Sequence, residues 1–275
     1  MYKSFDLTLF DNESMGLMNI REEDYNAYNR SIDKLRNLFL RKLFSDLGLR
    51  NEVGELEASS IKKKWFPHDK NYDVFISHSH KDIELAKKLA CWLKNEFNLN
   101  AFIDSTVWGY ADDLLRQIDD EYCVLNKNSV SKKIYDYDKR NYTTTHVHLI
   151  LVSALREMID SCECLIFLNT GNSVKLSNSM HKETDSPWIY DELQSARFIR
   201  KRKGKRKIVK TVDRSISIGQ ENNPTVNYDV DKELLNLKKL NIYMLIKWQQ
   251  RCSRNKENGI PEHPLDVLYK LDTMI

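Results

Sequence analysis

The sequence predicts an α/β fold, in which a parallel sheet is covered by helices on both faces. Between residues 72 and 212, short apolar runs rich in β-forming residues alternate with longer segments whose apolar residues recur at helical spacing. Each helix then has to carry the chain from one strand to the next. Such alternation favours right-handed crossovers and a parallel sheet, whose ligands bind beyond the carboxyl ends of the strands.

The composition is typical of a folded protein with reduced cysteines. Among the 275 residues, 41% are hydrophobic and 30% are charged, so the chain can bury a sizeable core. No window is apolar enough for a membrane span, and Met1–Phe10 is too polar for a signal peptide, so we expect a cytoplasmic protein without a membrane partner. Five cysteines without a C-x-x-C pair indicate free thiols, and a net charge of +3 does not by itself indicate nucleic-acid binding.

The strands and helices can be placed along the chain from these patterns. Buried strands are expected at Tyr72–Ser77, Ala101–Asp104, Cys164–Leu168 and Lys207–Val212. Helices are expected at Arg21–Leu49, Ala86–Phe97, Leu114–Ile118, Val147–Met158, Pro187–Arg200, Leu240–Trp248 and Leu265–Leu271. The chain would then comprise a helical N-terminal extension (1–70), a main domain (71–212) and a helical C-terminal extension (213–275).

Two local features of the main domain allow more than one interpretation. The polar insertion 126–145, with Tyr135, Tyr137 and Tyr142, is either a lid over a ligand site or a surface ornament. The basic run Arg200–Lys207 follows a predicted helix, where the helix dipole favours cations. A solvated helix end is therefore the preferred interpretation, with phosphate or nucleic-acid contact as the alternative.

Three short motifs follow one another in the main domain. They are D-V-F-I-S-H at Asp73–His78, F-I-D at Phe102–Asp104 and W-x-x-x-E at Trp188–Glu192. In this order they resemble the Toll/interleukin receptor (TIR) domains, and the resemblance covers Asn71–Val212. It implies a flavodoxin-like fold, with helical flanks added at both ends of this chain. The insertion 126–145 departs from the family because it lengthens the second crossover.

The best candidate site combines Trp188 and Glu192. These residues are four apart, so their side chains lie on one face of the predicted helix. An indole can stack on a planar ring, while a carboxylate can stabilise the positive charge that develops as an N-glycosidic bond breaks. The alternatives are a solvated carboxylate for Glu192 and a packing role for Trp188.

Other polar residues lie at the predicted ligand edge of the sheet. The resemblance implies that Ser77, His78 and Ser79 border a nucleotide pocket. Asp104 ends the second strand, where it either contacts a ribose or caps the next turn. His78 and His80, like the pair His146 and His148, supply two imidazoles without a recognisable third ligand, so no metal is predicted.

The resemblance implies an enzyme that cleaves NAD between nicotinamide and ribose, with NAD as substrate and no cofactor. Similar stand-alone bacterial proteins act in anti-phage defence, by depleting NAD or by making a cyclic or conjugated ADP-ribose signal for a downstream effector. It also implies self-association through the TIR domain. The alternatives are a non-catalytic TIR interaction module and a nucleoside ribosyltransferase-like enzyme.

Overall fold

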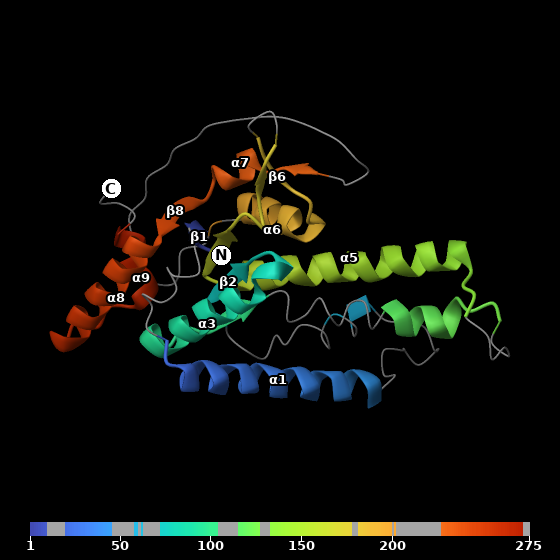
Figure 1. Ribbon diagram of the computed structural model, residues 1–275, viewed down its shortest axis with the longest axis horizontal. Helices are drawn as coiled ribbons and strands as arrows, with labels where there is room; N and C mark the ends of the chain where they lie inside the picture. The colour runs from blue at the N-terminus through green and yellow to red at the C-terminus, as the bar shows by residue number, and fades with distance from the viewer. Residues whose placement is uncertain are drawn as a thin grey trace. The chain divides into compact units, whose positions relative to one another are not determined.

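The computed structural model describes residues 1–9, 20–45, 58–59, 62, 72–103, 115–126, 133–177, 181–199, 201 and 227–271 (Figure 1). Within residues 35–45 only the backbone is described. The chain divides into two compact units. The first comprises Met1–Ser31, Asn71–Asp104 and Met158–Ile275, and the second comprises Ile32–Lys70 and Ser105–Glu157.

The first unit is built on a five-stranded parallel sheet. The strands are β1 (Lys3–Thr8), β2 (Val74–Ser77), β3 (Ala101–Ile103), β4 (Cys164–Asn169) and β8 (Lys238–Asn241). Their order is β3-β2-β4-β1-β8, and every neighbouring pair is parallel. The predicted α/β class is therefore confirmed, and β2, β3 and β4 have an arrangement compatible with a flavodoxin-like sheet.

Both flanks contribute strands to this sheet, which the sequence analysis did not predict. Strand β1 lies between β4 and β8, so a segment assigned to a helical extension forms an interior strand. The segment expected to be helical from Leu240 begins as strand β8, because Leu240 pairs with Leu7 of β1. Helix α8 (Ile242–Glu257) starts only after Asn241, whose side chain accepts a hydrogen bond from the Met244 backbone N–H. The predicted strand Lys207–Val212 lies outside the described residues.

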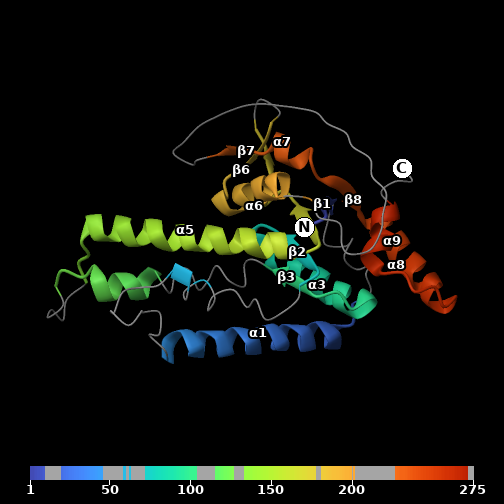
Figure 2. The ribbon, with the colours of Figure 1, turned by 180° about the vertical axis from the view of Figure 1, so that it is seen from behind.

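Helices cover both faces of the sheet in the first unit (Figure 1 and Figure 2). Helix α3 (Ile83–Phe97) packs against α8, and Trp248 of α8 stacks on Phe97 with ring centroids 4.0 Å apart. Helix α9 (Pro264–Leu271) packs on the face of the sheet that carries Phe5 of β1, because Tyr269 of α9 stacks on the Phe5 ring. Helix α6 (Pro187–Phe198) contacts Ser77, whose side chain points to the opposite face from that of Phe5.

Helices α3, α6 and α9 begin and end within three residues of the predicted bounds, whereas α5 (Tyr137–Ser161) begins ten residues earlier than predicted and α8 ends nine residues later. The predicted core residues of α3, from Ala86 to Phe97, are all buried, and the helix ends where Asn98 adopts a left-handed conformation with φ of 55°. Helix α1 (Glu22–Ser45) is confirmed in its backbone, whereas its predicted stripe beyond Ile32 lies outside the described side chains.

A small antiparallel sheet follows β4 in the first unit. It consists of β5 (Lys175–Leu176), β6 (Lys182–Thr184) and β7 (Tyr228–Asp229) in that order. Helix α7 (Asp231–Leu234) comes directly after β7 and contacts α6 through the ion pair of Glu233 with Arg197, 2.9 Å long. The C-terminal flank is therefore linked to α6 through α7, which follows the last strand of this sheet.

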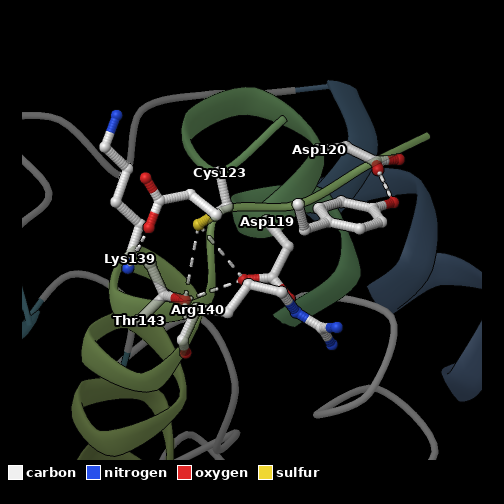
Figure 3. Close-up of polar contacts among 8 residues, drawn as sticks. Asp119, Asp120, Cys123, Lys139, Arg140 and Thr143 are labelled. Carbon is white, nitrogen blue, oxygen red and sulfur yellow. Dashed lines mark hydrogen bonds and ion pairs between the residues drawn. The ribbon is translucent and has the colours of Figure 1, made fainter. Parts of the chain in front are cut away.

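The second unit contains helical residues 115–122 and most of helix α5 (Tyr137–Ser161). The helix begins at Tyr137, so residues 137–145 of the predicted insertion are helical. The buried carboxylate of Asp119 accepts hydrogen bonds from Thr143 Oγ1 (2.7 Å) and Arg140 Nε (2.8 Å) and lies 3.5 Å from Cys123 Sγ (Figure 3). Asp119 thus ties residues 115–122 to the first turns of α5.

Candidate functional site

The candidate site lies where α6 meets the carboxyl end of β2. Helix α6 starts as the sequence predicts: Ser186 accepts a hydrogen bond from the Ile189 backbone N–H (3.3 Å), and Pro187 occupies the first turn. The apolar residues Ile189 and Leu193 anchor one side of the helix in the core. The same side presents Glu192 to the sheet.

Glu192 is completely buried and is joined to β2. Ser77 Oγ donates a hydrogen bond of 2.5 Å to Glu192 Oε2. Burying a carboxylate is unfavourable unless it is hydrogen-bonded, and this bond offsets part of that cost. The alternative interpretation of Glu192 as a solvated carboxylate is therefore wrong. The structure brings together two of the predicted site residues, which lie 115 positions apart in the chain.

His78 and Ser79 follow Ser77 directly at the carboxyl end of β2, the predicted ligand edge of the sheet. His78 is buried, and its Nδ1 lies 3.4 Å from the Ile76 carbonyl oxygen. Ser79 is half-buried and caps the short helix η2 (His80–Asp82), since its hydroxyl accepts from the Lys81 backbone N–H at 3.4 Å. The predicted segment therefore contributes a buried imidazole and a capping hydroxyl beside β2.

Trp188 lies in the first turn of α6, four residues before Glu192, and is half-buried. This position agrees with an indole one turn away from the carboxylate. Asp104 directly follows β3 and lies outside the described residues, so its predicted ribose contact stays a prediction. The basic run Arg200–Lys207 also lies outside them, apart from Lys201.

Asp82, which the sequence patterns did not single out, links the segments that follow β2 and β4. Its buried carboxylate accepts hydrogen bonds from Thr170 Oγ1 (2.5 Å) and Asn172 Nδ2 (2.7 Å). Thr170 and Asn172 belong to the loop after β4, whereas Asp82 belongs to the segment after β2. An acidic residue just before a helix is the available sequence signal, but it is also typical of a helix cap.

Chemically, this site offers a buried carboxylate held by a hydroxyl, with an indole one helical turn away. A carboxylate in a water-excluded position acts strongly on nearby positive charge, because the surroundings screen it less than water does. Within the described parts of the chain, no group of three or more His, Cys, Asp or Glu side chains is arranged to hold a metal ion.

Comparisons with protein-family models, with curated proteins and with solved structures found no match to this chain. Among the described helices, none is long and apolar enough to cross a membrane.

Proposed function

We propose that this protein is a TIR-type enzyme that breaks the bond between nicotinamide and ribose in NAD, with Glu192 as the catalytic carboxylate. The observation that carries the proposal is the buried Glu192 at the ligand edge of a parallel sheet, hydrogen-bonded by Ser77. Its neighbour Trp188 supplies an aromatic surface for the nicotinamide or adenine ring.

The reaction needs stabilisation of a cation and no metal or nucleophilic serine. The electron pair of the glycosidic bond leaves with the nicotinamide nitrogen, so the departing ring becomes neutral and the ribose carbon becomes positive. The Glu192 carboxylate stabilises that positive charge while water, an internal nucleophile or another acceptor attacks the ribose carbon. The acceptor decides whether the product is ADP-ribose, a cyclic form or a conjugate.

Glu192 is sealed from solvent in this structure, and this favours a protein with low activity until a trigger acts. A substrate can reach the carboxylate only after some of its surroundings move. An enzyme that consumes NAD needs such restraint in a resting cell. Release of the site by self-association fits this requirement and fits a role in anti-phage defence.

The same burial favours a second candidate, a non-catalytic interaction module. In that case the Ser77–Glu192 bond only fixes α6 on the sheet. The two candidates are separated by incubating the purified protein with NAD over a range of protein concentrations, with and without a crowding agent. Nicotinamide and ADP-ribose products are followed by mass spectrometry and particle size by light scattering. Nicotinamide release that rises with assembly supports the enzyme, and assembly without release at any concentration supports the module.

A further inference from the structure

Strand β1 carries a buried carboxylate on the same face of the sheet as Ser77. Asp6 is completely buried, and the register places it opposite Phe167 of β4, which in turn pairs with Ser77 of β2. Asp6 and Ser77 thus lie in one row, two strands and about 10 Å apart. Aspartate is disfavoured inside strands, and burying its charge costs stability, so packing does not explain its presence there.

Lys239 of β8 is the next residue in this row and forms an ion pair with Asp6 Oδ2. The lysine side chain is 62% exposed, whereas the Asp6 side chain is fully buried. A lysine that lies mostly in water can swing away from Asp6 with little loss of packing. The second oxygen, Asp6 Oδ1, has no hydrogen-bond partner among the described residues.

Helix α6 also carries a buried polar atom without a hydrogen-bond partner within the described part of the chain, the hydroxyl of Ser195. Ser195 follows Glu192 by three residues and therefore lies on the same side of the helix. It is 5% exposed. Buried polar atoms are normally hydrogen-bonded, so unsatisfied atoms on both α6 and the sheet point to a polar ligand or ordered water.

We propose that Asp6 and Lys239 form a second subsite beside the Ser77–Glu192 contact, which binds the ribosyl diphosphate part of a dinucleotide beyond the bond that Glu192 acts on. This inference rests on the proposed function for the identity of the ligand. The Asp6 carboxylate accepts hydrogen bonds from the ribose hydroxyls, and the Lys239 ammonium binds the diphosphate after leaving Asp6. The spacing of about 10 Å across two strands suits the extended remainder of NAD.

The test uses isothermal titration of the full chain with three probes: ADP, adenosine and inorganic pyrophosphate. Asp6→Asn is expected to weaken ADP and adenosine binding about 10- to 100-fold, as for the loss of a charged hydrogen bond, and to leave pyrophosphate binding equal or tighter. Lys239→Met should weaken ADP and pyrophosphate binding and spare adenosine. Ser4→Ala is the matched control, since Ser4 is a buried residue on the same face of β1, and it should leave all three affinities unchanged.

Three results would overturn the subsite. One is a wild-type protein that binds none of the probes at millimolar concentration, and another is equal affinity in all variants. The third is an equal loss for every probe in Asp6→Asn together with a lowered Tm, which indicates a purely structural carboxylate. Because Lys239 is mostly exposed, Lys239→Met keeps the test decisive if Asp6→Asn unfolds. Nicotinamide release is measured separately, so loss of the proposed activity and loss of the subsite are distinguishable.

Discussion

The hydrogen bond between Ser77 and Glu192 can be measured with a double-mutant cycle of Ser77→Ala and Glu192→Gln. In the Ser77→Ala variant a fully buried carboxylate loses its 2.5 Å donor, which should lower the free energy of unfolding by about 1.5–3 kcal/mol. When Glu192→Gln is already present, the same change removes a bond between neutral groups, worth about 0.5–1.5 kcal/mol. The expected coupling free energy is therefore about 1 kcal/mol or more.

The assay is urea unfolding of the four proteins at pH 7, with Ser4→Ala as a control for removing a buried hydroxyl from the same face of the sheet. The control should give the same loss of stability with and without the Glu192→Gln substitution. Additive effects of Ser77→Ala and Glu192→Gln, within about 0.3–0.5 kcal/mol, would refute the pairing of β2 with α6 through these side chains.

Three further predictions concern the indole, the second unit and the buried thiols. Trp188→Ala should weaken NAD use while Trp188→Phe largely preserves it, as judged by the KM for nicotinamide release with Tm recorded alongside. Asp119→Asn removes the charge that pairs with Arg140 and should increase hydrogen exchange in the first turns of α5. Burial raises the pKa of Cys162 to about 12 and also raises that of Cys164, so stability should fall as the pH rises above about 9, where unfolded thiols ionise. At pH 10 each thiol should account for about 1.5 kcal/mol of this loss.

Each of these predictions has a contradicting result. Equal damage from both Trp188 substitutions would indicate that the indole N–H or simple packing matters. Unchanged exchange in α5 of Asp119→Asn would show that this carboxylate does not organise the helix start. For the thiols, a Cys162→Ala/Cys164→Ala variant should lose less stability than the wild type between pH 8 and 10, and an identical slope would assign the alkaline effect to other groups.

The sequence predicts the elements with strong periodicity well and misses strands whose residues look exposed. Helix α3 shows a continuous apolar stripe, and α6 carries both a capping serine and a proline in its first turn, so both are predicted close to their observed ends. In β1 the polar Ser4 and Asp6 alternate with Phe5 and Leu7, a pattern of a half-exposed strand. Both faces of β1 are nevertheless buried, because β1 lies inside the sheet between β4 and β8 and helices cover both faces.

The candidate site is predictable only in part for a related reason. Helical spacing places Trp188 and Glu192 on one side of α6, but it does not reveal which residue faces them across the core. The Ser77–Glu192 contact and the row from Ser77 to Asp6 depend on strand order and register. Local sequence does not encode these features, because residues far apart in the chain create them.

The central claim is tested most directly by comparing nicotinamide release from NAD by the wild-type protein and by Glu192→Gln. Both proteins are used at the same concentration, the one at which the wild type releases the most nicotinamide. Glutamine keeps the shape of the side chain and can still accept the Ser77 hydrogen bond, so the variant should fold with a similar Tm. Loss of the negative charge should reduce release by about two to three orders of magnitude. Equal release by the folded variant, or no release by the wild type at any concentration, would contradict the assignment of Glu192 as the catalytic carboxylate of an NAD-cleaving enzyme.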